Sequence, residues 1–369
     1  MFDIRYNQDR ISLDKSSKKY ICPSCGKRTF VNYVYPSGEP VASGECGRCD
    51  RLDNCAYHCP PKQYFAEHKT LTDYSQPIRP RQYHKTYEPP QPPSYIDKNI
   101  MLASLKNYSS NPLAVKLHNI FDRFTGAEIV DSTLIEYATG TSKKFGGSAC
   151  YWEIDHLGGI RNAHIMGYYA TGKRNGKNSH VPEALHLQNF NKKRCFFGAH
   201  VIVEKDRRAS LKNEERRQMN ISGEVNPEIW LFESQKAALI VEIFMKWGGA
   251  SDIFVPMACA GCQGLNPTSE AFRDPYDKHQ VLKGRKVVLF PDAGKFAEWE
   301  SRGKKLRGFA SEVWISTCLE RDLHPHKIDC EINTGDGFDD ILLRYLDSGK
   351  DVWNLILTSY GYKGQYRIV

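Results

Sequence analysis

Four acidic residues in the C-terminal half of the sequence are the strongest candidates for chemistry. Glu233 and Asp292 each follow a short apolar run that predicts a buried strand, and each precedes a segment with helical spacing. Asp339 and Asp340 begin an amphipathic helix. Carboxylates that follow parallel strands lie at the edge of a sheet where ligands bind, and their oxygens suit a hard divalent cation. Each acid taken alone is explained equally well as a helix N-terminal carboxylate.

Soft metal ligands gather near the N-terminus, at Cys22, Cys25, Cys46, Cys49, Cys55, His58 and Cys59. The first four stand in a C-x2-C-x20-C-x2-C pattern, which is typical of a zinc ribbon. A structural zinc ion takes four ligands, so some of the seven must remain free. We expect four of the five cysteines Cys22, Cys25, Cys46, Cys49 and Cys55 to hold one zinc ion. Cys46 and Cys55 remain alternatives for the fourth position.

Other patterns carry weaker signals. Cys259 and Cys262 have metal or redox spacing, but their apolar surroundings favour packing. Basic residues gather in runs that could approach phosphates beside flexible glycines, namely Lys173, Arg174 and Lys177, and then Lys192, Lys193 and Arg194. For any one of these runs taken alone, a solvated protein face is the favoured explanation.

The composition is that of a globular protein able to form several domains. The chain has 369 residues, of which 40% are hydrophobic and 25% charged, and its net charge is +8. That modest surplus is compatible with nucleic-acid binding. We expect a cytoplasmic protein with no membrane contact, because the chain has neither a long apolar run nor an apolar leader. In that compartment, its 12 cysteines are metal ligands or reduced core residues rather than disulfides.

The order of patterns predicts an α/β protein with a multidomain α+β organisation. Residues 1–65 are expected to form the zinc ribbon. Residues 66–99 include the stretch PIRPRQYHKTYEPPQPP, whose prolines predict a semi-rigid linker. Residues 100–222 mix helical and strand patterns in a basic lobe, and residues 205–217 form an exposed loop or helix. Residues 223–369 repeat strand, acid and helix, which predicts a parallel sheet flanked by helices.

Several stretches together resemble a known family. ESQKAA from Glu233, ACAGCQG from position 258, FPDAG around Asp292 and the pair Asp339-Asp340 resemble the Toprim core of primases, topoisomerases and related nucleases. Upstream, the ribbon and the segments TGTSKKFGG, YWEIDHLGG and KKRCFFGAH resemble a DnaG-type bacterial primase. The likeness is closest to primase-like proteins of Bacteroidetes mobile elements and phages.

This resemblance implies an activity and its partners. It implies synthesis of short primers on single-stranded DNA from nucleoside triphosphates, with Mg²⁺ or Mn²⁺ held by Glu233, Asp292 and one of Asp339 and Asp340. A separate helicase or replication initiator would recruit the protein. By the same resemblance, template or triphosphate would contact Lys173, Arg174, Lys192, Lys193 and Arg194, and Lys236 would position a phosphate.

One position departs from the family pattern. Primases usually carry a second aspartate two residues after the strand-tip acid, and here that residue is Gly294. The acid pair Asp339-Asp340 would have to supply the missing carboxylate. Two alternatives therefore stay open, a catalytically degraded nucleic-acid-binding protein and a Toprim nuclease.

Overall fold

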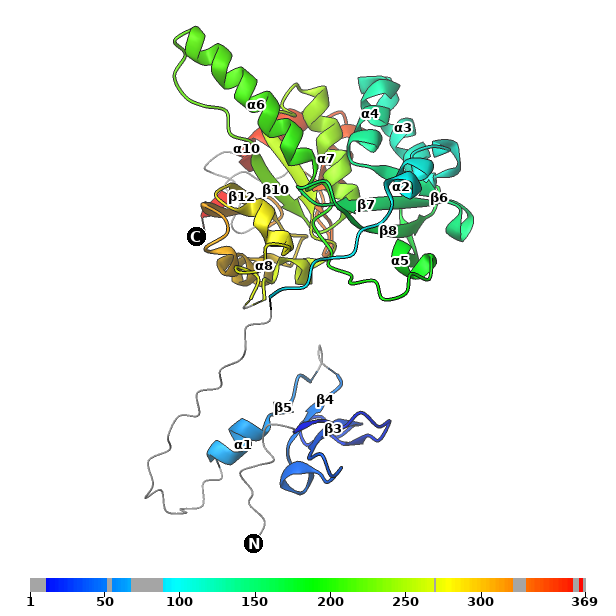
Figure 1. The fold of residues 1–369 in the computed structure, drawn as a ribbon, viewed down its shortest axis with the longest axis vertical. Coiled ribbons are helices and arrows are strands. Elements are labelled where there is room, and N and C mark those ends of the chain that lie inside the picture. The colour runs from blue at the N-terminus through cyan, green and yellow to red at the C-terminus, as the bar shows by residue number, and fades with distance from the viewer. Residues whose placement is uncertain are drawn as a thin grey trace. The chain divides into compact units, whose positions relative to one another are not determined.

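The computed structural model of the protein describes residues 11–51, 55–67, 89–268, 270–320, 330–360 and 365–367. The chain divides into two compact units, Met1–Thr86 and Tyr87–Val369 (Figure 1). Most of the proline-rich segment, residues 68–88, lies outside the described residues. The boundary that the sequence predicts at residues 222 and 223 falls inside the second unit and stays a prediction.

The first unit is a small antiparallel sheet with strand order β1-β3-β4-β5, in which β2 also pairs with β3. Its elements are β1 (Ser12–Leu13), β2 (Tyr20–Ile21), β3 (Arg28–Val34), β4 (Gly47–Cys49), β5 (His58–Cys59) and α1 (Pro61–Glu67). Among the residues of this unit that the structure describes, the buried apolar cluster consists of Cys22, Phe30 and Cys49 with a few partly buried neighbours. Burial in a core this small does not stabilise a fold by itself, so a further constraint is required.

The second unit begins with helices around an antiparallel sheet of order β6-β7-β8-β9. The strands are β6 (Thr139–Ser142), β7 (Ser148–Ile154), β8 (Ile160–Tyr168) and β9 (Arg174–His180). The helices are α2 (Lys98–Ser104), α3 (Pro112–Thr125), α4 (Ala127–Glu136) and α5 (Val181–Ala184). A tight turn joins β7 to β8 through Gly158, whose φ of 87° favours glycine.

A second sheet of order β11-β10-β12-β13-β14 completes this unit. Its strands are β10 (Glu228–Phe232), β11 (Phe254–Ala258), β12 (Lys286–Phe290), β13 (Glu312–Ser316) and β14 (Gln365–Arg367). The first four are parallel, and β14 is antiparallel to β13. Its helices are α6 (Val201–Gln218), α7 (Gln235–Trp247), α8 (Phe296–Gly303), α9 (Phe338–Asp347) and α10 (Val352–Tyr360).

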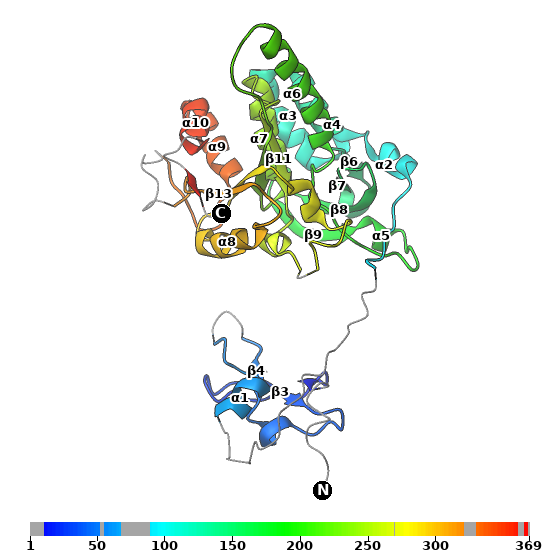
Figure 2. The same cartoon turned by 60° about the vertical axis from the view of Figure 1, so that its left-hand side comes forward.

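Because successive side chains of a strand point to opposite faces, each face of this sheet packs against its own apolar core. Trp230 and Phe232 of β10 face a core shared with α7, α9 and α10, whereas Ile229 and Leu231 face a core shared with α8. Figure 2 shows α8 apart from the pair α9 and α10.

Short 3-10 helices lie between these elements in both units. They are η3 (Val41–Gly44), η4 (Tyr108–Ser110), η5 (Lys144–Gly146), η6 (Cys262–Leu265), η7 (Lys278–Leu282) and η8 (Lys304–Leu306).

The charge-mixed segment 205–217 forms most of helix α6, which projects beyond the rest of the second unit in Figure 1. Its first turns are anchored rather than exposed. Lys205 is fully buried, and its Nζ lies 2.7 Å from Oε2 of Glu242 in α7 and 2.7 Å from the carbonyl oxygen of Phe254. A buried ion pair persists only when further hydrogen bonds satisfy it, and Ser251 supplies one to Glu242.

The structure therefore confirms the predicted mixed α+β fold with an N-terminal ribbon. Among the described residues, no helix combines the length and the apolar character needed to cross a bilayer.

Candidate functional site

Topology brings the candidate acids to one edge of the parallel sheet. Strand β10 pairs with β11 on one side and with β12 on the other, so the connection after β10 runs towards β11 and the connection after β12 runs the opposite way, towards β13. In open α/β sheets, ligands bind at the carboxyl ends of the strands beside such a switch point. Phe232 pairs with Phe290 in register, so Glu233 and Asp292 emerge from adjacent strands at this edge.

The acids are close enough to perturb one another. The pKa of Asp292 is raised to about 7 by burial first, and then by the negative charges of Glu233, Asp339 and Asp340. Arg174, at the start of β9, acts in the opposite direction on the same carboxyl group. Four acids from β10, β12 and the start of α9 therefore share one electrostatic environment with a cation from the antiparallel sheet.

Gly337 keeps a space open between two of these carboxylates. A β-carbon at this position would lie 2.5 Å from Oδ1 of Asp339 and 3.3 Å from Oδ1 of Asp292. Its φ of −88° is available to any residue, so backbone geometry does not require glycine here. The absence of a side chain is what lets both oxygens face the same small volume.

Lys236 neutralises the other side of the cluster. It lies in the first turn of α7, and its Nζ is 3.0 Å from Oδ2 of Asp339 and 3.2 Å from Oδ1 of Asp340. Burial alone lowers the pKa of Lys236, but the two carboxylates raise it above its ordinary value. The sequence resemblance assigned Lys236 to a phosphate, whereas in the structure it contacts the acids.

The carboxylate oxygens at this edge are of the type that binds a divalent cation. Oε2 of Glu233 is buried without a hydrogen-bond partner, and the space at Gly337 is bordered by two further carboxylate oxygens. Carboxylate oxygens are the ligands of Mg²⁺ and Mn²⁺. Within the described residues, no three carboxylates bring ligand atoms within 4.8 Å of one another. A bound ion would therefore draw these side chains closer together.

Gly294, where the family pattern places an acid, has a φ of 82°. A β-carbon there would meet only Cγ2 of Thr334, at 3.5 Å. Space is available for a side chain, but the left-handed backbone disfavours one.

The predicted phosphate-binding cations occupy two different settings. Lys173 and Arg174 are exposed at the turn into β9, and Arg174 influences Asp292. The other three are paired within the protein. Lys192 contacts Glu183, Lys193 contacts Asp274, and Arg194 contacts Glu153 through two nitrogens.

Sequence reasoning missed a histidine pair beside this edge. His164 of β8 and His180 of β9 stack with ring centroids 4.7 Å apart, and Nδ1 of His164 lies 3.2 Å from the amide nitrogen of Gln235 in α7. Burial, helped by nearby cations, lowers the pKa of both rings to about 4. The alternation of β8 and β9 could have placed the two rings on one face, but only the strand register shows that they are opposite each other.

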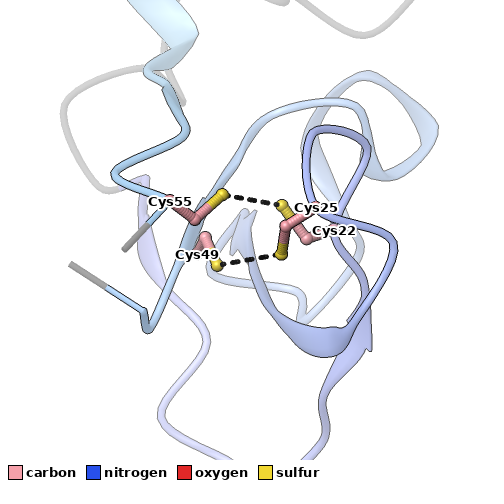
Figure 3. Close-up of side chains that lie close together, drawn as sticks. All are labelled: Cys22, Cys25, Cys49 and Cys55. Atoms are coloured by element: carbon pink, nitrogen blue, oxygen red, sulfur yellow. Dashed lines mark hydrogen bonds between the residues drawn. The ribbon is translucent and has the colours of Figure 1, made fainter. Parts of the chain in front are cut away.

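The first unit contains a second site, built from thiols. Cys22 and Cys25 flank a tight turn after β2, Cys49 ends β4, and Cys55 lies before β5, and all four sulfurs lie within 4.8 Å of one another (Figure 3). Sγ of Cys22 is 3.7 Å from that of Cys55, and Sγ of Cys25 is 3.9 Å from that of Cys49. Tetrahedral zinc with Zn–S bonds of about 2.3 Å places its sulfurs about 3.8 Å apart.

Hydrogen bonds favour the thiolate form at two of these four cysteines, whereas burial raises the pKa of Cys22. The backbone N–H of Lys27 lowers the pKa of Cys25 to about 6, and the hydroxyl of Thr29 lowers the pKa of Cys49. Cys46, the alternative fourth ligand, lies outside the group and beside Cys59, and burial raises its pKa to about 11. The four close cysteines support the predicted structural zinc, with Cys55 in the fourth position.

Cys259 and Cys262 show the features of packed residues. Both are buried, and the thiol of Cys259 contacts the carbonyl oxygen of Phe232 at 3.2 Å. Burial raises the pKa of Cys262 to about 12, which is unfavourable for a thiolate.

Two protein families match parts of the sequence. A family described as a zinc beta-ribbon finger matches residues 9–70. A family described as a domain of unknown function (DUF6371) matches residues 115–293, a range that includes Glu233 and Asp292 and ends before Asp339. The comparison with curated proteins found no match.

Several solved structures with a similar fold are bacterial and phage primases. The RNA polymerase domain of Mycobacterium tuberculosis primase DnaG, in complex with a double-stranded DNA oligomer with a 6-nucleotide overhang, is 11% identical with a TM-score of 0.38, and the match covers 70% of this chain and 77% of that chain.

Two further structures match over a longer range. The primase fragment of the bacteriophage T7 primase-helicase is 11% identical with a TM-score of 0.35, covering 94% of this chain and 100% of that chain. The zinc-binding and RNA polymerase domains of Aquifex aeolicus primase are 12% identical with a TM-score of 0.35, covering 97% and 82%. TM-scores and identities this low carry no conclusion by themselves.

Proposed function

We propose that this protein is a primase-like nucleotidyltransferase that makes short oligonucleotides on single-stranded DNA from nucleoside triphosphates. The observation that carries the proposal is the approach of Oδ1 of Asp292 and Oδ1 of Asp339 at the space left by Gly337, with Glu233 close enough to Asp292 to raise its pKa, at the switch point of the parallel sheet. Mg²⁺ or Mn²⁺ bound there would neutralise nucleotide phosphates and align a 3′-hydroxyl for in-line attack.

The chain's own residues prepare this edge for an anionic substrate. Glu233, Asp292 and one oxygen of Asp339 supply ligands, with Asp340 beside them. Lys173 and Arg174 lie exposed at the turn into β9, where their positive charges can hold a phosphate close to the carboxylates. Lys192, Lys193 and Arg194 can contribute only by exchanging their present acidic partners for phosphate.

The motif order, which resembles primase-like proteins of Bacteroidetes mobile elements and phages, is the basis for assigning the activity to replication of such an element. A separate helicase or initiator would bring the protein to its template.

A second candidate is a nucleic-acid-binding protein whose catalytic site has degraded. Gly294 favours it, because the missing acid leaves fewer ligands at the edge. So does the absence, within the described residues, of three carboxylates with ligand atoms within 4.8 Å.

One assay separates the candidates. The protein is incubated with single-stranded DNA, labelled nucleotides and Mg²⁺ or Mn²⁺, and the products are resolved on a gel. New short oligonucleotides that disappear in E233Q and D292N support the proposal. Shortened template identifies a nuclease, and altered mobility of the DNA without any product contradicts both enzyme functions.

A further inference from the structure

Lys236 brings a permanent positive charge into the carboxylate edge. It stands one helical turn after Glu233, in a helix whose start is fixed by the side chain of Ser234 accepting from the N–H of Ala237. The Lys236 side chain is only 21% exposed, and its Nζ lies between Asp339 and Asp340 at 3.0 and 3.2 Å. Helix and burial together restrict the places that this ammonium group can reach.

Asp339 is shared between two environments. Its Oδ2 contacts the ammonium group of Lys236, whereas its Oδ1 borders the space at Gly337, together with Oδ1 of Asp292. The carboxylate is 3% exposed, so its two oxygens cannot both turn to solvent. One oxygen of Asp339 therefore contacts the ammonium group, and the other borders a space where a metal cation can bind.

The open side consists of Glu233 and Asp292. Within the described part of the chain, neither acid forms an ion pair, and Oε2 of Glu233 is buried without a hydrogen-bond partner. Arg174 affects Asp292 through its charge without an ion-pair contact. Uncompensated carboxylate oxygens therefore remain at Glu233 and Asp292, which are not the acids that Lys236 contacts among the described residues.

The geometry points to Lys236 as a built-in cation that replaces a second divalent ion. One divalent ion binds at Glu233, Asp292 and Oδ1 of Asp339, and the ammonium group holds Asp340 and Oδ2 of Asp339. This inference rests on the proposed function, because it takes the edge to be a divalent-ion site. The four acids carry a formal charge of −4, which one divalent ion and Lys236 reduce to −1.

The same arrangement explains why position 294 can be a glycine instead of the acid that the family pattern has there. A site that holds one divalent ion and one ammonium group needs fewer carboxylates than a site for two divalent ions. A second divalent ion near Asp339 and Asp340 would lie beside the ammonium group and be repelled by it.

Counting bound Mn²⁺ tests this inference. Zinc-loaded full-length protein is titrated with Mn²⁺, and free Mn²⁺ is followed by electron paramagnetic resonance, which needs no substrate and no turnover. We expect one Mn²⁺ per wild-type chain, one in the charge-conserving control K236R, and two in K236M, where the chain length is similar and the charge is gone. D292N should lower the affinity of the single ion at least tenfold.

The outcomes distinguish the two proposals. Two Mn²⁺ ions in the wild-type protein, or a single ion in folded K236M, would overturn the role of Lys236 while leaving the proposed function intact. No Mn²⁺ in the wild-type protein would overturn the divalent site and the proposed function with it. The wild-type count requires no variant, so the test holds even where K236M does not fold.

Discussion

At the scale of single residues, the zinc site shows how much a spacing pattern leaves open. The C-x2-C repeat contains Cys22, Cys25, Cys46 and Cys49, but the cluster of further ligands left Cys46 and Cys55 as alternatives for the fourth position. The structure distinguishes them because Cys46 points to Cys59, whereas the sulfur of Cys55 completes a group with tetrahedral spacing.

The two cysteines make a matched pair of variants. We expect C55S to lose bound zinc and to unfold the first unit, because zinc binding supplies about 10–16 kcal/mol to small domains of this kind. C46S should keep one zinc ion per chain. Elemental analysis and amide proton spectra of both proteins test this, and zinc retained by C55S but lost by C46S would show that the ligand assignment is wrong.

No pattern in the sequence predicted a role for Gly337. Glycine beside an acid pair suggests a loop, and only the structure shows that its missing side chain separates Asp292 from Asp339 by open space.

We expect G337A to weaken Mn²⁺ binding at least tenfold, because a methyl group would occupy the space that both carboxylates border. Gly335 provides the control. It has a φ of 87° and open surroundings, so G335A should cost about 1 kcal/mol of stability while leaving Mn²⁺ affinity unchanged. Calorimetric titration and thermal unfolding measure the two effects, and equal Mn²⁺ affinity in G337A and wild type would contradict the assignment.

At the scale of secondary-structure elements, prediction succeeded where apolar periodicity was strong. The strands before Glu233 and Asp292 and the helices after them form as expected, because a fully apolar run has few alternatives to a buried strand. Local pattern could not show that Lys205 is buried. Its neighbours in α6 are charged, and its partner Glu242 lies in another helix.

The histidine pair joining β8 and β9 predicts a pH dependence of stability. Burial, followed by nearby positive charges, lowers the pKa of His164 and of His180 from the ordinary value of 6.5 to about 4 in the folded protein. Between pH 6.5 and 4 the unfolded chain therefore binds protons that the folded chain does not. The free energy of unfolding should fall as the pH is lowered through this range.

Urea denaturation of wild type and of the double variant H164Q/H180Q measures this dependence. The variant should lose less stability between pH 6.5 and 4.5 than the wild type, since its amide side chains do not titrate. Parallel pH profiles for the two proteins would refute the contribution of the pair.

At the scale of the whole molecule, the sequence order of motifs anticipated a ribbon followed by a lobe with a parallel sheet. It could not anticipate how the acids meet, because that depends on the strand order β11-β10-β12 and on where α9 begins. Nor could it show that Lys236 faces the acids instead of solvent. Both depend on contacts between residues about sixty to one hundred positions apart in the chain.

Template-directed synthesis is the most direct test of the central claim. The protein is given labelled ATP, Mn²⁺ and either an oligo-dT or an oligo-dA template, and the products are sized on a gel. We predict labelled oligonucleotides only with the complementary oligo-dT template, and their loss in D292N. Equal labelling on both templates, or no labelled product with any nucleotide and its complementary template, would contradict the account.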